Sequence, residues 1–412
     1  MPRGQDSARG LVFYESEEGQ AMSTQAVMST YARTDLVFER GEGSWLISAN
    51  DQRFLDFNSG IAVNALGHAH PHLVEALQDQ AGKFWHCSNL YRIDGQEKLA
   101  QRLIDASFAD TAFFCNSGAE ALECAIKTAR RYHQAGGRYE KYRIITADNA
   151  FHGRTLATIA AGGQAKHLDG FAPVVDAFDH VPFGNLNEAR AAVTEETAAV
   201  LVEPVQGEGG LAVATDDYLK GLRAMADEFG LLLIYDEVQC GMGRTGNMFA
   251  YEKSGVAPDI MALAKALGGG FPVGACLATS EAAEHMVPGT HGSTFGGNPL
   301  AMAAANAVLD VMLAEGFMAR VQTASKKLRS GLDDLVASND SVFEGVRGRG
   351  LMLGLKCHVP NGDVVSALIH EHMLTVVAGD NVVRLLPPLT MSDEEIELAL
   401  EKLYAAAKVL AV

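Results

Sequence analysis

Short apolar runs alternate with longer amphipathic stretches through the middle of the chain. In the longer stretches apolar residues recur every three or four positions, as at Leu122, Ala125, Ile126 and Ala129, which predicts helices. The short runs are typical of buried strands and cover residues 112–115, 142–148, 198–203, 231–236 and 259–265. Buried strands that alternate with amphipathic helices favour an α/β fold, with a mostly parallel sheet and helices on both faces.

Polar residues mark where several of these helices are expected to begin. Their side chains can accept hydrogen bonds from the free backbone N–H groups of a first helical turn. We expect three simple N-caps, at Ser117, Thr215 and Asn298. Two further pairs have the spacing of a capping box, Asp94 with Glu97 and Ser392 with Glu395.

Composition restricts the classes of partner. The 412 residues include 33 Lys and Arg against 51 Asp and Glu, so the net charge is 33 − 51 = −18. That acidity argues against nucleic acid and anionic membrane surfaces as partners. No apolar run approaches the length of a membrane span, and the first residues lack a signal-peptide core. Six cysteines without a CxxC pair predict reduced, mostly buried thiols in a cytoplasmic protein.

Two charged residues stand at the ends of neighbouring apolar runs. Lys265 ends one run just before three glycines, where partial desolvation would favour its neutral, nucleophilic amine. Asp236 ends the other and offers a fixed carboxylate that can pair with a ring nitrogen. A Schiff-base lysine and an acid that pairs with a pyridinium are what pyridoxal 5'-phosphate (PLP) chemistry requires. The alternative for Lys265 alone is an ordinary solvated loop lysine.

Two other motifs invite different functions. Residues 241–246 satisfy GxGxxG, but five residues separate them from the strand, whereas a dinucleotide fingerprint opens at the strand end. His68, His70 and His72 have strand-like spacing, so a metal site is the alternative there. No carboxylate or cysteine ligand is evident nearby and Pro71 breaks a strand, so we expect no metal.

A strand, a small-residue turn and a helix start coincide at residues 112–120. Free N–H groups at a helix N-terminus suit an anion, so Ser117, Gly118 and Ala119 form a candidate phosphate site. The alternative is simply a well-capped helix. Further on, Phe151 offers a face for an aromatic ring, and Arg154 offers a planar fork for a carboxylate.

From about Tyr31 to its C-terminus, the chain resembles the class III aminotransferases of fold type I. The resemblance is carried by LIYDEVQCGMGRTG, ALAKALGGGFPVGA and FHGRT. It implies a large domain on a mostly parallel central sheet and a smaller α+β domain. We accordingly divide the chain into four parts. Residues 1–28 are a polar N-terminal extension, and residues 29–70 are the N-terminal part of the small domain. Residues 71–300 form the large PLP-binding domain, and residues 301–412 form the C-terminal small domain.

The resemblance also implies the cofactor and its contacts. PLP would be linked to Lys265, its ring nitrogen would pair with Asp236, its 3-oxygen would contact Gln239, and Phe151 would stack on the ring. Its phosphate would lie on residues 117–119 and be reached by Thr294 of a neighbouring subunit, so a homodimer is expected. Relatives often carry Thr in place of Ala119 and Asn in place of Leu122, so this chain lacks those polar contacts.

Substrate contacts follow from the same resemblance. Tyr31 would line the entrance, Arg154 would bind the donor carboxylate, and Glu203 would pair with Arg384 until Arg384 takes the carboxylate of the oxo acid. Within the class, FNSGIAVNALGH, FHGRT and VEPVQGEGG are most similar to acetylornithine aminotransferases of arginine biosynthesis. These move the δ-amino group of N-acetylornithine to 2-oxoglutarate, which becomes glutamate.

Other functions stay open at this point. Ornithine, succinyldiaminopimelate and 4-aminobutyrate aminotransferases fit the same motifs. A PLP aminomutase or decarboxylase on this fold would need no external 2-oxo acid, which distinguishes it. A non-catalytic binding protein is disfavoured because Lys265 and Asp236 are both present.

Overall fold

The computed structural model describes residues 26–411, which divide between Val37 and Phe38 into two units. All assigned helices and strands belong to the second unit. Residues 1–25, which make up most of the predicted polar extension, lie outside the described residues. Tyr31 belongs to the first unit and its side chain is exposed.

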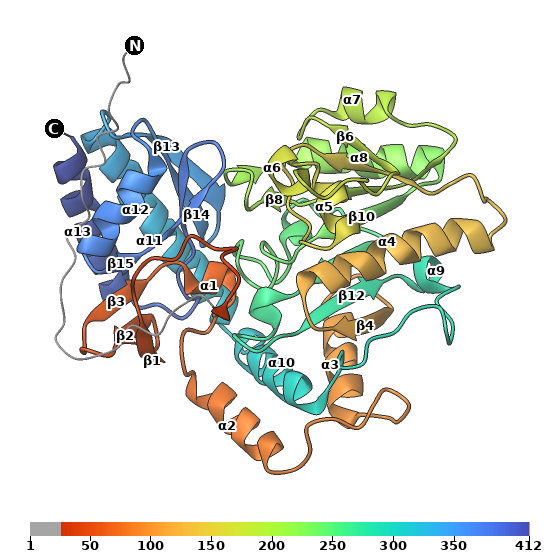
Figure 1. Cartoon of the computed structure of the whole chain (residues 1–412), viewed down its shortest axis with the longest axis horizontal. Coiled ribbons are helices and arrows are strands. Elements are labelled where there is room, and N and C mark those ends of the chain that lie inside the picture. The colour runs from red at the N-terminus through yellow and green to blue at the C-terminus, as the bar shows by residue number, and fades with distance from the viewer. Residues whose placement is uncertain (1–25, 412) are drawn as a thin grey trace. The chain divides into compact units, whose positions relative to one another are not determined.

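A seven-stranded sheet forms the centre of the second unit (Figure 1). Its order is β4 Thr111–Cys115, β12 Gly274–Ala278, β11 Ile260–Leu263, β10 Leu232–Asp236, β7 Thr197–Val202, β5 Arg143–Ala147 and β6 Phe178–Val181. Only β12 runs against the others. β7, β10, β11 and β12 are buried along their whole length, as apolar runs without alternation predict. The mostly parallel central sheet is thereby confirmed.

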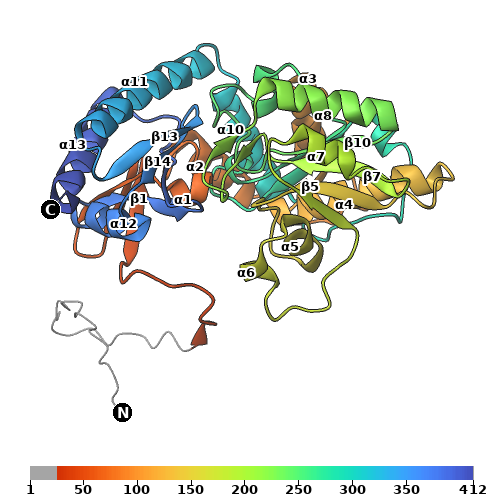
Figure 2. The same ribbon diagram turned by 90° about the horizontal axis from the view of Figure 1, so that it is seen from above.

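Helices cover both faces of this sheet. On one face α8 Asp216–Phe229, α3 Asp94–Asp105 and α10 Pro299–Met312 pack on side chains such as Leu233. On the other, α4 Gly118–Ala135 and α5 Leu156–Gly162 pack on the alternate residues, such as Ile234. Figure 2 shows α8 and α5 on opposite sides of the strands. Shorter helices on this part of the chain are α2 Pro71–Ala81, α6 Ala165–Leu168, α7 Leu186–Ala191 and α9 Ser280–Ala283.

Two four-stranded sheets make up the rest of the second unit. One is antiparallel, with β13 Phe343–Arg349, β14 Met352–Cys357, β17 Val382–Leu385 and β16 Val376–Ala378, beside α11 Phe317–Ser338, α12 Asn361–His370 and α13 Asp393–Leu410. The other joins β1 Phe38–Glu42, β2 Trp45–Ser48 and β3 Arg53–Asp56 to β15 Met373–Leu374. Its pairing of β3 with β15 connects the two ends of the chain. The minor elements are β8 Val205–Gln206, β9 Ala212–Val213 and 3₁₀ turns at Ala250–Lys253 and Lys265–Leu267.

The proposed domain boundaries remain predictions. Residues 38–56 and 373–374 share one sheet, although they are far apart in sequence. Helix α10 begins at the expected boundary between residues 300 and 301, yet it packs against α2 and α3.

The predicted helix starts at Ser117, Thr215 and Asn298 and the capping box of Ser392 with Glu395 are confirmed. The capping box of Asp94 with Glu97 is wrong, because Ile93 is the N-cap and no side chain caps that helix. Glu97 instead accepts two hydrogen bonds from Arg92, of 2.7 and 2.6 Å. A bidentate arginine contact is stronger than a bond to a backbone N–H, so it takes the carboxylate away from the cap.

A left-handed turn precedes α2. Helix α1, Ser59–Ala62, has positive φ at all four residues, three of which are not glycine. Asp56 holds the turn in place: its Oδ1 accepts from the backbone N–H of Asn58 and Ser59, and its Oδ2 lies 2.7 Å from His68 Nε2. The next residue after the turn, Val63, lines the cavity described below.

Two of the three histidines of GHAHPH pair with different carboxylates, and the buried Nδ1 of His70 has no hydrogen-bond partner within residues 26–411. His68 meets Asp56, and His72 meets Asp310 on α10 at 2.9 Å. Within residues 26–411, no three His, Cys, Asp or Glu side chains gather as metal ligands.

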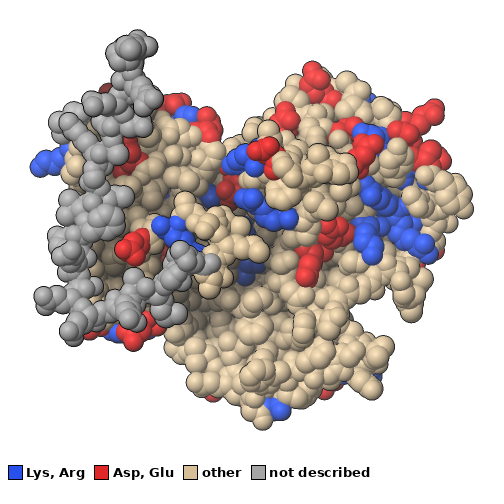
Figure 3. All heavy atoms as spheres, in the orientation of Figure 1, with Lys and Arg blue, Asp and Glu red and all other residues tan. Residues whose placement is uncertain are grey.

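The remaining features of the molecule are its surface charges, the apolar content of its helices and the state of its cysteines. Acidic and basic side chains are both spread over the face drawn in Figure 3, with Lys and Arg gathered over α4. Over residues 26–411 no single helix is long and apolar enough to cross a membrane; the bent pair α10 and α11 passes that test together, by length and composition only. All six cysteines are free, and five of them are buried, as predicted.

Candidate active site

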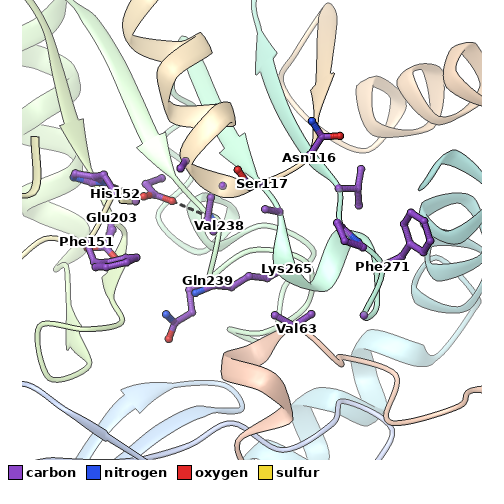
Figure 4. Close-up of a pocket in the computed structure, with 18 residues that line it drawn as sticks. Val63, Asn116, Ser117, Phe151, His152, Glu203, Val238, Gln239, Lys265 and Phe271 are labelled. Atoms are coloured by element: carbon purple, nitrogen blue, oxygen red, sulfur yellow. Dashed lines mark hydrogen bonds and ion pairs between the residues drawn. The ribbon is translucent and has the colours of Figure 1, made fainter. Parts of the chain in front are cut away.

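A cavity of about 320 Å³ lies at the carboxyl ends of the parallel strands. Parallel sheets keep their binding sites at this edge. Of the predicted site residues, eight line it: Ser117, Gly118, Ala119, Phe151, Glu203, Asp236, Gln239 and Lys265. Figure 4 shows side chains from several elements around one space, with Phe151, His152 and Glu203 on one side and Asn116 and Phe271 on the other.

Lys265 follows β11 in a tight turn with φ of +45°. A Cβ at Gly268 would lie 1.9 Å from the carbonyl oxygen of Phe271, so the chain can close this turn only with glycine there. Burial lowers the pKa of Lys265 to about 8, although the carboxylates of Glu208, Asp236 and Glu203 partly oppose it. A substantial fraction of the amine is therefore neutral and nucleophilic near neutral pH.

Asp236 ends β10 and is held on both oxygens. Its Oδ1 accepts from the Val238 N–H at 3.0 Å, and its Oδ2 lies 2.8 Å from His152 Nδ1. Burial alone would lower the pKa of His152, but the hydrogen bond and charge of Asp236, with the charge of Glu203, raise it overall. His152 and the Val238 N–H together fix the direction of the Asp236 carboxylate.

Sequence analysis selected Phe151 and Arg154 on either side of His152 but missed His152 itself. Its position in FHGRT was the only signal in the sequence. Because Asp236 is 84 positions further along the chain, their contact depends on how β5 and β10 are placed in the sheet.

Glu203 does not pair with Arg384, so the expected pair is corrected. The Glu203 carboxylate accepts from the backbone N–H groups of Phe151 and Gly207, at 3.1 and 3.2 Å. Burial and then the charge of Asp236 raise its pKa to about 7. Glu203 directly follows β7 and is buried, and the two backbone N–H groups hold both of its oxygens.

Glu208 takes the role of partner to Arg384. Arg384 Nη1 lies 2.6 Å from Glu208 Oε1 and 3.2 Å from Gln239 Oε1, and Nη2 donates to the Val377 carbonyl. The guanidinium is 1% exposed, whereas the Glu208 side chain is 27% exposed. Glu208 also lines a neighbouring cavity of about 1000 Å³, so its carboxylate has room to leave Arg384. The second acid of VEPVQGEGG was the sequence signal that we passed over.

The N-terminus of α4 forms the opposite wall of the cavity. The Ser117 side chain accepts a hydrogen bond from the Glu120 N–H at 3.3 Å. The N–H groups of Gly118 and Ala119, which line the cavity, have no partner within the helix. This end packs closely: a Cβ at Gly118 would meet Val238 at 2.7 Å. A Cβ at Gly153 would meet the Ala119 side chain, also at 2.7 Å.

The remaining predicted residues do not line this cavity. The Arg154 guanidinium lies 5.5 Å from the centre of the Phe151 ring and is exposed. Thr294 lies on an exposed loop and lines a different cavity with Asn116 and Glu120. Leu122, the departure on α4, is fully buried in the core.

Comparison with known proteins places this arrangement in a family. The family model for aminotransferase class-III matches residues 27–407. The chain belongs to the class-III aminotransferases. It is 61% identical to the acetylornithine aminotransferase of Mesorhizobium japonicum over 95% of this chain and 98% of that protein. It is 59% identical to the acetylornithine aminotransferase of Agrobacterium fabrum, over 94% and 97% of the two chains.

Solved structures of the class share the fold. The N-acetylornithine aminotransferase of Stenotrophomonas maltophilia superposes with a TM-score of 0.82 at 38% identity, over 94% of this chain and 99% of the other. The ornithine aminotransferase of Toxoplasma gondii gives 0.90 at 29% identity, over 94% and 93%. Similarity of backbone therefore does not separate the two substrates.

Proposed function

We propose that this class-III aminotransferase uses PLP to move the δ-amino group of N-acetylornithine to 2-oxoglutarate in arginine biosynthesis. The products are N-acetylglutamate semialdehyde and glutamate. The observation that carries this proposal is one cavity that holds Lys265, Asp236 and the N-terminus of α4 together. Identity near 60% to two acetylornithine aminotransferases supports the choice of donor.

The residues of the cavity fit PLP in size and in chemistry. Its volume lies at the lower end of the range for small-molecule sites, about 300–1,000 Å³. The free N–H groups of α4 suit a phosphate, and Asp236 suits a protonated ring nitrogen. When bound, PLP supplies an electron-accepting ring that stabilises negative charge at the reacting carbon.

Lys265 performs two tasks in this scheme. Its neutral amine attaches the cofactor, and once a substrate amine has displaced it, the same nitrogen carries the proton between carbon atoms. A pKa of about 8 suits both tasks, because the amine can accept and release a proton near neutral pH. Asp236, with His152 behind it, holds the proton on the ring nitrogen, while Phe151 covers the ring and Gln239 contacts its 3-oxygen.

Two unlike substrates share the site through Arg384. The amino donor reacts through its distal amine, so its own carboxylate lies far from the reacting centre and reaches Arg154. An unpaired buried arginine would be costly, and Glu208 neutralises Arg384 during this half-reaction. When 2-oxoglutarate enters, Glu208 withdraws toward the neighbouring cavity and Arg384 binds the carboxylate beside the reacting carbon. Glu203 forms part of the wall of the cavity.

We also propose a homodimer with shared sites. Five large apolar side chains are about half to nine-tenths exposed, Phe84, Trp85, Leu90, Tyr91 and Phe295. The first four lie on one loop, which Asn89 ties to the loop of Phe295 by donating to the carbonyls of Ser293 and Gly296. Exposed apolar patches of this kind mark protein interfaces. Thr294 is part of the same surface and would reach the phosphate of the partner.

Substrate choice is tested by steady-state kinetics on a panel of donors. We expect kcat/KM for N-acetylornithine to exceed that for ornithine, succinyldiaminopimelate and 4-aminobutyrate, with turnover dependent on 2-oxoglutarate. A higher kcat/KM for ornithine would show that the enzyme is an ornithine aminotransferase instead. Turnover without any oxo acid would favour an aminomutase or decarboxylase. The free thiols favour a cytoplasmic enzyme.

A further inference from the structure

A second cavity, of about 560 Å³, lies on the α4 face of the central sheet. It shares no lining residue with the cavity of Lys265. Its rim includes the exposed residues Val287 and Pro288, and its inner wall includes Cys124 on α4 and Cys276 on β12. The catalytic scheme above uses none of these residues.

The two thiols face one another. Cys124 and Cys276 are 2% and 4% exposed, both are free, and both belong to one buried cluster at the wall of this cavity. Cys124 Sγ also lies 4.0 Å from Thr128 Oγ1, one helical turn away. A pair of buried thiols, at the wall of an open cavity, is an arrangement that a structural core does not require.

Two basic side chains approach Cys124. His291 hydrogen-bonds to Cys124, and Lys127 Nζ lies 2.8 Å from His291 Nδ1. An ammonium group can only donate, so Lys127 makes Nδ1 the acceptor and leaves Nε2–H as the donor to the sulfur. Lys127 also donates to the Thr290 carbonyl at 3.0 Å, which anchors the loop that carries His291.

The pKa of Cys124 is lowered, whereas the pKa values of other buried cysteines are raised. The hydrogen bond from Cys276, followed by that from His291, lowers the pKa of Cys124 against the effect of burial. Burial instead raises the pKa of Cys115 to about 12 and that of Cys357 to about 11. Because the thiolate is the nucleophile, Cys124 is the buried cysteine prepared to react.

We propose that Cys124 and Cys276 form a dithiol site for small peroxides, with Cys124 as the attacking and Cys276 as the resolving thiol. The Cys124 thiolate attacks one oxygen of hydrogen peroxide; an S–O bond forms, the O–O bond breaks, and the leaving hydroxide takes a proton to become water. Cys276 then attacks the Cys124 sulfur; an S–S bond forms, the S–O bond breaks, and a second water leaves with the Cys276 proton. Two thiols lose two electrons and the peroxide gains them.

The test is peptide mapping of the holoenzyme after treatment with one equivalent of hydrogen peroxide. We expect a Cys124–Cys276 disulfide to form before any other buried cysteine is oxidised. Cys115 and Cys357 are the internal controls, because they are buried like Cys124 but burial raises the pKa of each thiol. Oxidation at Cys115 or Cys357 that precedes or equals that at Cys124 would overturn the proposal.

Variants test the separate roles. In Cys276→Ser the reaction should stop at a sulfenic acid on Cys124 that a 1,3-diketone probe traps, whereas Cys115→Ser should still give the disulfide. Lys127→Met changes an exposed residue, so the fold should persist, and oxidation of Cys124 should slow on the order of tenfold. An unchanged rate in Lys127→Met, or no trapped sulfenic acid in folded Cys276→Ser, would also contradict the assignment.

Discussion

At the scale of single residues, the site is a group of charges that control one another. Glu203, Asp236 and His152 are all buried; the imidazole of His152 pairs with Asp236, and Glu203 accepts backbone N–H groups. His152 is hydrogen-bonded to Asp236, whereas burial and then the charge of Asp236 raise the pKa of Glu203 to about 7. Two acids of the same type therefore have different roles because their environments differ.

Lys265 gives a prediction about pH. Its pKa is lowered from an ordinary value of 10.5 to about 8, so the neutral amine increases as pH rises through 8. The rate at which PLP becomes linked to the apoprotein should therefore rise about tenfold between pH 7 and 9 and then level off. Stopped-flow absorbance of the linked cofactor measures this rate. A rate that still climbs in proportion to hydroxide above pH 9 would show that Lys265 keeps its ordinary pKa.

The pairing of Arg384 gives a second prediction. Glu208→Ala should leave Arg384 unpaired throughout the cycle and admit glutamate into the first half-reaction, where it competes with N-acetylornithine. The preference for N-acetylornithine over glutamate should fall on the order of tenfold to a hundredfold, because a contact between charged groups is lost. Single-turnover kinetics of each half-reaction measures the preference.

Glu203→Gln is the matched control for Glu208→Ala. Glu203 accepts one backbone N–H group on each of its two oxygens and does not contact Arg384, so Gln keeps one of these hydrogen bonds and leaves the Arg384 pair intact. The preference between the two amines should therefore stay as in the unaltered enzyme. The reverse result, with Glu203→Gln altering the preference and Glu208→Ala leaving it unchanged, would restore Glu203 as the partner of Arg384.

At the scale of elements, local patterns predicted the sheet and the ends of its strands. Lys265 and Asp236 were identified because each directly ends an apolar run, and Ser117 because a capped helix follows a strand. Contacts between distant elements were not predictable in this way. The partner of Arg384 lies 176 positions away, and choosing Glu208 over Glu203 depends on which way the loop after β7 turns.

The turn Ser59–Ala62 shows a second limit of local patterns. Ile61 has φ of +64°, which costs a β-branched residue more than most, so no propensity predicts it. Contacts from outside the turn must offset that cost. Asp56 provides them, through two backbone N–H groups and His68. Strained backbone beside a cavity is often functional, and this turn places Val63 in the wall of the site.

Asp56 therefore gives a prediction about stability. Asp56→Ala should remove the acceptor for the turn and lower the free energy of unfolding by about 3 kcal/mol, the cost of lost hydrogen bonds to a buried charge. KM for the amino donor should rise as well, because Val63 is no longer held. Denaturant unfolding and steady-state kinetics measure the two effects.

Asp79→Ala is the control for Asp56→Ala. Asp79 lies inside α2, where alanine is well tolerated, and its side chain is 66% exposed in a pair with Lys83. A surface pair of this kind contributes less than about 1 kcal/mol, so its loss should change neither stability nor KM noticeably. Similar losses in both variants would show that Asp56 has no special connection with the turn.

At the scale of the whole molecule, the proposed dimer would decide whether each site is complete. Thr294 lies outside the cavity of Lys265, on the loop next to the exposed apolar residues, so we propose that it contributes to the phosphate site of the partner subunit. A residue that acts in its own subunit and one that acts in the partner give different results when two defective chains are combined. Heterodimers of Lys265→Ala and Thr294→Ala subunits therefore test the arrangement.

If Thr294 acts across the interface, both defects fall in one of the two sites and the other site is intact. The heterodimer should then bind one PLP with the affinity of the unaltered enzyme and show about half its activity per dimer, by the count of intact sites. If Thr294 acts within its own subunit, each site carries one defect and no site has full affinity. Differently tagged subunits, co-expressed and purified through both tags, allow PLP titration and turnover to be measured on heterodimers alone. Weakened PLP binding at every heterodimer site would contradict the shared arrangement.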